Sequence, residues 1–183
     1  MTALRIAYST GIIAFAACVI ACGGTGSPTP APEKPGERVE GLGKPSTIDG
    51  MEVVIRGAFI ENVALELIGG GMGSSQDKEM ELLVAVRSTD PAKRFEYTTW
   101  TGIDRHVTDD VGNKYSHVLY SNGRPVGRTV NATVRSDEVV LDVLVIERPV
   151  PAAKHLDIDL PAPFDKSKVF RFRIKTADIK RPQ

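Results

Sequence analysis

Residues 81–87 read ELLVAVR, and this stretch decides the fold class of the chain. Two charged residues enclose five consecutive apolar ones, a run of the length and composition typical of a buried β-strand. No stretch of ordinary helix length repeats its apolar residues with the helical period of 3.6. The sequence therefore predicts an all-β protein with this strand in its interior.

The residues on either side of this strand continue the pattern. From Met51 onward, apolar residues recur at every second position, and turn-forming residues interrupt them at short intervals. We expect an initial strand or pair of strands and several later ones, at residues 51–56, 59–67, 94–100, 107, 114–120, 128–134, 139–147, 156–160 and 169–175. About eight strands of this kind are typical of an antiparallel β-sandwich with two packed sheets.

Residues 109–113 (DDVGN) predict a tight hairpin turn, because Gly and Asn adopt the backbone angles that such turns need. The same stretch, together with Asp104, also gathers oxygen atoms of the kind that bind calcium. The order of ligands in an EF-hand loop is absent, which favours the turn. Whether the Asp109–Asn113 hairpin binds a cation stays open at this point, and no metal is assigned.

The order of these segments carries a resemblance. A buried strand (81–86), an aromatic strand (97–100) and the D-x-x-G-x-x-Y hairpin of Asp109, Gly112 and Tyr115 follow one another, and later strands at 142–150 and 170–174 fit the same series. The series resembles the immunoglobulin-like domain of unknown function found in many bacterial lipoproteins. This resemblance implies an immunoglobulin-like sandwich over residues 51–181 and a location in the cell envelope. It implies no activity and no catalytic residues.

The first 21 residues are typical of a signal peptide, with Arg5 ahead of an apolar run. The run ends in Val19-Ile20-Ala21-Cys22, which resembles the lipobox that the lipoprotein signal peptidase cleaves. The resemblance implies that the Cys22 thiol receives a diacylglycerol and that the chain is cut just before this residue. In Gram-negative sorting, Gly23 in place of Asp implies the outer membrane.

Three other interpretations of this leader stay open. Cys18 also follows small residues, but Phe15 stands where an aliphatic residue is preferred, and the chain after Cys18 stays apolar. An uncleaved anchor would be short for a membrane span. An ordinary secretory signal would leave Cys22 as an unpaired thiol in an oxidising compartment. Lipidation of Cys22 explains this cysteine and the polar residues after it.

Residues 22–50 are rich in Gly, Pro, Ser and charged side chains, with little that can be buried. We expect Cys22 to be followed by a flexible, disordered tether, and about 27 such residues reach roughly 30 Å. A proline-rich recognition motif is the alternative, since four prolines fall between residues 28 and 35.

Composition excludes several classes of function. The chain has 23 basic and 23 acidic residues, so no overall charge favours nucleic acid. Both cysteines lie in the first 22 residues. Disulfides, thiolate metal sites and a cysteine nucleophile are therefore excluded from residues 51–181.

The remaining polar residues predict no catalytic, cofactor-binding or metal site. The histidines His106, His117 and His155 lack zinc-site spacing, although the first two flank one hairpin. Asp157 and Asp159 share the solvated face of a strand. The Gly-rich residues 69–75 lack the lysine of a phosphate loop and are expected to connect two strands, and Trp100, the one tryptophan, is expected in the core.

The leading functional hypothesis is a membrane-anchored envelope lipoprotein whose domain binds or scaffolds another envelope protein through loops or a sheet edge, without catalysis. One alternative is a small-ligand carrier or an enzyme whose site is built from loops. Another is a purely structural envelope protein. Cys22 is the single residue to which the sequence assigns a chemical role.

Overall fold

A computed structural model describes residues 37–102 and 107–182 of the chain. The predicted signal peptide, Cys22, Asp104 and His106 lie outside the described residues. The described part consists of strands and one short 3₁₀ helix, η1 (Thr176–Asp178). Within it, no helix has the length and apolar character needed to cross a membrane.

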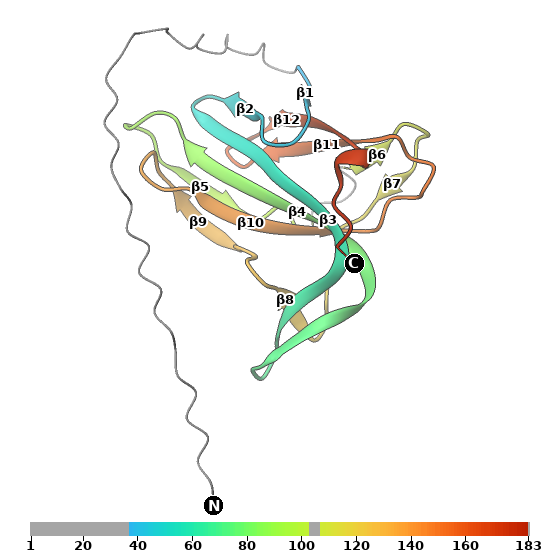
Figure 1. The fold of residues 1–183 in the computed structure, drawn as a ribbon. Helices are drawn as coiled ribbons and strands as arrows, with labels where there is room; N and C mark the ends of the chain where they lie inside the picture. Colours follow the sequence, from blue (N-terminus) through green and yellow to red (C-terminus); the bar gives the residue numbers. More distant parts are fainter. Residues whose placement is uncertain (1–36, 103–106, 183) are drawn as a thin grey trace, which may run out of the picture. The chain divides into compact units, whose positions relative to one another are not determined.

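Two five-stranded sheets and one two-stranded sheet make up the domain (Figure 1). The first sheet has the order β1 (Val39–Glu40), β12 (Asp165–Lys175), β11 (His155–Ala162), β6 (Val107–Asp109) and β7 (Lys114–Tyr115). The second has the order β10 (Val140–Ile146), β4 (Met72–Ser88), β3 (Met51–Leu67) and β2 (Pro45–Ile48), with β8 (Gly123–Pro125) also paired to β3. The third pairs β5 (Phe95–Thr98) with β9 (Asn131–Val134). The predicted all-β sandwich is confirmed.

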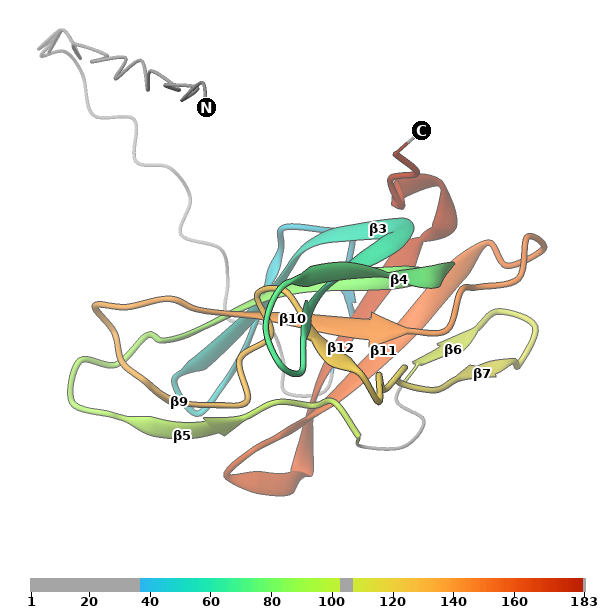
Figure 2. The same cartoon turned by 90° about the horizontal axis from the view of Figure 1, so that it is seen from below.

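Side chains from the two large sheets meet in one main core. Along β11 the buried and half-buried residues alternate strictly, and β12 and β10 follow the same alternation over most of their length. Figure 2 shows β11 and β12 lying across the layer of β3, β4 and β10. The largest fully buried side chains of the two layers include Met51, Ile55, Leu82, Phe170 and Phe172. Burial of these aliphatic and aromatic groups holds the sheets together.

The strand count and the start of the domain differ from the sequence prediction. Within the described residues twelve strands form where about eight were expected, because strands of two to four residues such as β1, β2 and β8 are too short to show alternation. The prediction of a disordered tether up to residue 50 is wrong for β1 and β2. Val39 is buried in the core, and Gly41 N–H donates to the Arg173 carbonyl (2.8 Å). Composition does not reveal backbone pairing of this kind.

The pairing of β1 with β12 is parallel, so the sandwich is not entirely antiparallel. The predicted initial strand or pair is one continuous strand, β3, with irregularities in its pairing to β4 after Ile55 and after Asn62. The first irregularity places one extra residue in β3 and changes which side of the sheet the next residues face, whereas the second places two extra residues in β4 and leaves that side unchanged. As a result Met51, Val53 and Ile55 face the main core, whereas Val63 and Leu65 pack elsewhere.

The outer halves of β3 and β4, with the turn between them, form an arm (residues 61–79) that extends away from the sandwich at the bottom of Figure 1. The arm packs on β10 and on residues 118–120 through a small second core. The buried members of this second core are Val63, Leu65 and Val145, with Leu67, Val118, Tyr120 and Val143 partly buried around them.

Candidate functional site

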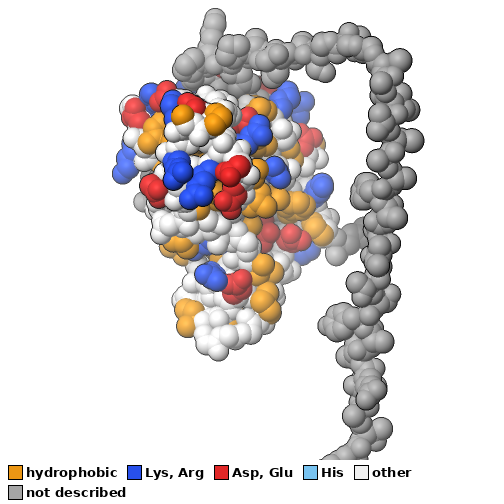
Figure 3. Space-filling model, turned by 90° about the vertical axis from the view of Figure 1, so that its left-hand side faces the viewer, with side chains coloured by type: hydrophobic (Ala, Val, Ile, Leu, Met, Phe, Trp, Pro, Cys, Tyr) orange, Lys and Arg blue, Asp and Glu red, His pale blue; other side chains and the backbone are white. Residues whose placement is uncertain are grey.

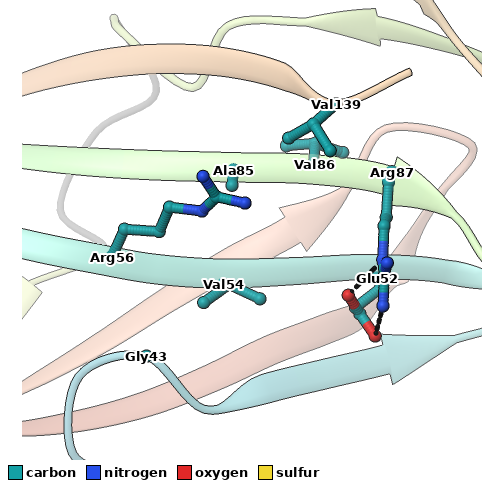
Figure 4. Close-up of a pocket in the computed structure, with 8 residues that line it drawn as sticks. All are labelled: Gly43, Glu52, Val54, Arg56, Ala85, Val86, Arg87 and Val139. Carbon is teal, nitrogen blue, oxygen red and sulfur yellow. Dashed lines mark hydrogen bonds and ion pairs between the residues drawn. The ribbon is translucent and has the colours of Figure 1, made fainter. Parts of the chain in front are cut away.

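A groove on the outer face of β3 and β4 is the candidate site (Figure 4). It encloses about 460 Å³. Its lining residues come from β3, β4, the turn before β2 and the residue that precedes β10: Gly43, Glu52, Val54, Arg56, Ala85, Val86, Arg87 and Val139. The strand alternation that sends Val53 and Ile55 into the core turns Glu52, Val54 and Arg56 outward into this groove.

The floor of the groove is apolar. Val54 and Ala85 lie opposite each other in the pairing of β3 with β4, and Val139 stands at the side, 40% exposed. Aliphatic side chains on an exposed sheet face offer a surface that another apolar group can cover. The floor alone would accept many partners, so specificity has to come from the charged groups around it.

Arg56 brings an unpaired positive charge to the groove. Its side chain is exposed and extends over the floor toward Ala85 (Figure 4). Among the described residues, no hydrogen-bond acceptor or acidic group pairs with its guanidinium. A guanidinium presents several N–H donors in one plane and matches a carboxylate in a two-pronged hydrogen-bonded pair. Arg56 is therefore available to an acidic group on a ligand.

Arg87 is already engaged with Glu52. Its Nε donates to Glu52 Oε1 at 2.6 Å, and its Nη2 donates to Glu52 Oε2 at 3.2 Å. The hydrogen bond and the charge of Glu52 raise the pKa of Arg87. The Arg87 side chain is about half exposed, at 51%, whereas Glu52 is largely covered. The pair thus fixes one wall of the groove and leaves Arg56 as its free cation.

The lining residues present aliphatic side chains and three charged groups. Glu52 is the one acid or base among the eight lining residues, and Arg87 holds both of its oxygens. No hydroxyl, thiol or imidazole lines the groove. A ligand with an aliphatic part on Val54 and Ala85 and a carboxylate on Arg56 would match every group that the groove presents.

A second hollow of about 590 Å³ lies beside Trp100, between β5 and the end of β11. Thr98, Pro161 and Pro163 are among its lining residues. The prediction that Trp100 fills the core is confirmed, because the side chain is 1% exposed and its ring N–H donates to the Pro161 carbonyl at 2.8 Å.

A buried carboxylate that the sequence prediction missed lies close to this second hollow. Asp142 on β10 is fully buried and accepts hydrogen bonds from the Tyr97 hydroxyl (2.5 Å), the Thr99 hydroxyl (2.7 Å) and the Thr129 N–H (2.8 Å). Burial, and then the Asp142 charge, raise the pKa of Tyr97. The alternation of β10 could have revealed this group, since Asp142 falls in phase with the buried Val140 and Leu144. Its three donors tie β5 and the Thr129 loop to β10.

The predicted hairpin turn at Asp109–Asn113 is confirmed, and its carboxylate serves the turn. Asp109 accepts hydrogen bonds from Val111 N–H (3.0 Å), Asn113 N–H (2.8 Å) and the Tyr115 hydroxyl (2.7 Å). Burial opposes the charge of Asp109, yet these hydrogen bonds prevail and hold its pKa at about 2. Asp110 accepts from Lys154 N–H at 2.8 Å. Within residues 37–102 and 107–182, no cluster of three acidic, histidine or cysteine side chains could hold a metal.

Asp157 and Asp159 share one face of β11, as predicted, and arginines pair with them there. Arg173 makes a two-pronged pair with Asp157 (2.7 and 2.9 Å), and Arg38 lies 2.9 Å from Asp159. The Arg173 hydrogen bond lowers the pKa of Asp157. His155 lies 4.0 Å from Asp157.

The other residues that the sequence analysis considered lie in β-bridges and turns. His117 forms an isolated bridge with Ile146, and its expected neighbour His106 lies outside the described residues. Residues 69–71 form the turn at the end of the arm, and β4 begins at Met72, so this Gly-rich stretch connects two strands as predicted. The prediction for Cys22 falls outside the described residues.

The groove arginines carried no sequence signal of their own. Arg56 and Arg87 read as ordinary charged ends of strands, and only the pairing register of β3 with β4 places them on one face. Neither the length nor the composition of the strands fixes that register. The groove was therefore not predictable from spacing within either strand.

Comparison with known proteins adds one structural likeness. No protein-family model matches the chain, and no curated protein matches it in sequence. Among solved structures, the chain is similar to a candidate lipoprotein (ycdA) from Bacillus subtilis subsp. subtilis str. 168, with 16% identity and a TM-score of 0.46. The likeness covers 73% of this chain and 39% of the other, so this chain spans less than half of that structure.

Proposed function

We propose that the protein is an exported lipoprotein, anchored to a membrane of the cell envelope through lipid on Cys22, whose immunoglobulin-like domain binds another envelope component without catalysis. The segment Val19-Ile20-Ala21-Cys22 and the polar residues after it support the anchor. In a Gram-negative cell, Gly23 favours the outer membrane. The groove on β3 and β4 supports binding.

The start of the fold shortens the proposed tether. About 15 residues separate Cys22 from Arg38, and a flexible chain of that length reaches on the order of 20 Å. This is less than the reach of a tether that continues to residue 50. The domain is accordingly held close to the membrane surface, where it meets other membrane-bound proteins.

The single observation that carries the binding function is the unpaired guanidinium of Arg56 beside an apolar floor. The proposed partner is a segment of an envelope protein that places an aliphatic side chain on Val54 and Ala85 and a carboxylate on Arg56. A hydrogen bond to a charged group contributes about 1.5–3 kcal/mol. One such contact therefore changes affinity by roughly 10- to 100-fold.

The anchor is tested by growing cells on labelled palmitate. The wild-type chain and Cys18→Ser should carry the label, and Cys22→Ser should not. Persistent label in Cys22→Ser would overturn the assignment of the lipid site. Loss of label in Cys18→Ser alone would move the site to Cys18.

The binding function is tested by crosslinking the membrane-anchored chain in its own envelope and isolating it. Arg56→Glu should reduce recovery of a specific partner at least tenfold. Arg94→Glu is the matched control, because Arg94 is an exposed arginine that does not line the groove. Equal recovery by both variants would reject the groove as the binding site.

The hollow beside Trp100 favours a second candidate function, the carriage of a small apolar ligand. The single tryptophan provides the test. The dye 8-anilinonaphthalene-1-sulfonate, bound in that hollow, would accept excitation energy from Trp100. Thr98→Phe, a bulky replacement in the lining of the hollow, should block the dye and abolish the transfer. Absence of transfer in the wild type would count against a carrier.

A further inference from the structure

The end of the arm carries exposed aliphatic side chains and no charge. Ile68 is 78% exposed and Met72 64%. Residues 67–76 and 118–123 contain no acidic or basic residue. We call these two stretches together the arm tip. On the face seen in Figure 3, the lower end of the molecule is mostly white and orange.

The two charges that flank the turn on the β3 and β8 side neutralise each other. Glu66 and Arg124 lie directly opposite in the pairing of β3 with β8, and their side chains are 2.6 Å apart. The pair stands where the uncharged stretch ends. Asp77 and Lys78 lie farther down the arm, where Lys78 pairs with Asn62. The approach of Ile68 and Met72 to an apolar medium therefore requires no isolated charge to lose its water.

The backbone of the arm tip is internally hydrogen-bonded. Leu67 N–H donates to the Gly71 carbonyl (3.1 Å), Gly70 N–H to the Leu67 carbonyl (3.0 Å) and Ile68 N–H to the Asn122 carbonyl (2.9 Å). An unsatisfied backbone group costs several kcal/mol in hydrocarbon. A hairpin end closed in this way can enter the boundary of a bilayer at lower cost than an open loop.

The base of the arm is acidic. Glu61 and Glu79 lie opposite each other in the pairing of β3 with β4, and Glu81 follows on the same face. These carboxylates would repel an anionic bilayer surface. Any membrane contact of the arm tip therefore depends on apolar insertion and favours lipids without net charge.

We propose that the arm tip inserts Ile68 and Met72 into the interfacial region of a zwitterionic bilayer. Three glycines with positive φ form its turn, and a Cβ added at any of them would meet nothing within 4 Å. A turn of this flexibility can adapt to the fluid surface of a bilayer, and it would match a rigid protein pocket less well. The affinity rests on the proposed Cys22 anchor, which holds the tip beside the bilayer and raises its effective concentration.

This contact would fix the orientation of the domain relative to the membrane. The start of the fold at β1 and the arm tip lie at opposite ends of the domain in Figure 1. With the tether at one end and the arm tip at the other both on the membrane, the domain lies along the surface. Without the second contact it would be free to stand away from the bilayer.

The test places a fluorophore on the arm of the full, membrane-anchored chain. Ser74→Cys, labelled with an environment-sensitive nitrobenzoxadiazole dye, reports on the arm tip and leaves Ile68 and Met72 intact. Ser136→Cys is the matched control, an exposed serine in the turn before β10. The labelled chains are reconstituted into phosphatidylcholine vesicles and into vesicles that contain one third phosphatidylglycerol.

In phosphatidylcholine the Ser74→Cys dye should shift to the blue and be quenched by doxyl-labelled lipid, while the Ser136→Cys dye should not. Phosphatidylglycerol should reduce the shift. Adding Ile68→Ser and Met72→Ser should lower the inserted fraction about tenfold. Flotation of the chain with vesicles reports the anchor separately. An unshifted dye on floating protein, equal shifts at both sites, or a shift that appears only with added envelope proteins would overturn the proposal.

Discussion

The two cores of the molecule contain the same kinds of aliphatic residue and differ greatly in extent. The main core draws buried side chains from both large sheets, whereas the second core buries three residues between the arm, β10 and residues 118–120. Because hydrophobic stabilisation scales with the buried area, the sandwich and the arm cannot share one stability. The main core therefore stabilises the scaffold, whereas the second core holds an arm that can open locally.

The largest effect is expected for Leu82→Ala in the main core. Leu82 is fully buried on β4, and its truncation should lower the free energy of unfolding by about 3–5 kcal/mol, because the rigid layers around it leave a cavity. Urea denaturation measures this loss. Leu141→Ala, at a 43% exposed site on β10, is the control and should cost about 0.5 kcal/mol or less. A loss below 2 kcal/mol at Leu82 would contradict the picture of a rigid scaffold.

Asp142→Ala should have the next largest effect, about 2–3 kcal/mol. The substitution leaves the buried Tyr97 and Thr99 hydroxyls and the Thr129 N–H without their acceptor. Tyr97→Phe removes one donor and keeps the carboxylate, so it should cost about 1 kcal/mol. Both values are read from chemical denaturation. Equal losses in the two variants would show that the carboxylate has no role beyond its bond to Tyr97.

Leu65→Ala makes the same truncation in the second core and should cost only about 1–2 kcal/mol. Leu65 is as well buried as Leu82, but the arm can open locally, which limits the loss that global unfolding records. Amide hydrogen exchange should accelerate in residues 61–79 and 118–125 and stay unchanged in β11 and β12. Exchange that accelerates across the whole sandwich would show that the arm and scaffold unfold as one unit.

The sequence predicted the scaffold better than the arm for a physical reason. Strands such as β10 and β11 have one face in the main core, so their apolar residues alternate and can be recognised in isolation. Residues 72–79 read MGSSQDKE and are half-buried or exposed, so they carry no apolar period. Their strand exists because β3 offers a pairing partner, in the register Ala64 with Ser74 and Asn62 with Lys78.

The candidate site could not be predicted from the sequence for a related reason. The groove depends on Arg56 and Arg87 from different strands, and the arm tip depends on Asn122 and Gly123 pairing with the end of a hairpin some fifty positions earlier. Long-range pairing of this kind leaves no mark on local composition. Asp142 is the exception, since its phase with Val140 and Leu144 marks it as buried within a single strand.

Acidification should change the stability of the sandwich and of the arm in opposite directions. We expect this to be the smallest of the four predicted effects. In the sandwich, hydrogen bonds prevail over burial and hold the folded pKa of Asp109 at about 2, below its ordinary value near 4. The stability that this carboxylate contributes is present above pH 4 and is lost as the pH falls toward 2. At the base of the arm, burial and then Glu61 raise the pKa of Glu81, so protonation relieves a cost that exists at neutral pH.

Lowering the pH from 7 to 4 should therefore stabilise the arm before the sandwich loses stability. Hydrogen exchange of residues 61–79, corrected for its intrinsic pH dependence, should slow over this interval, and the urea midpoint should fall only below pH 4. Glu61→Gln should lower the pKa of Glu81 in part, because burial, the larger cause, remains. Asp109→Asn should flatten the acid limb of the urea midpoint. If both regions lose stability over the same pH interval, the carboxylates do not distinguish the arm from the scaffold.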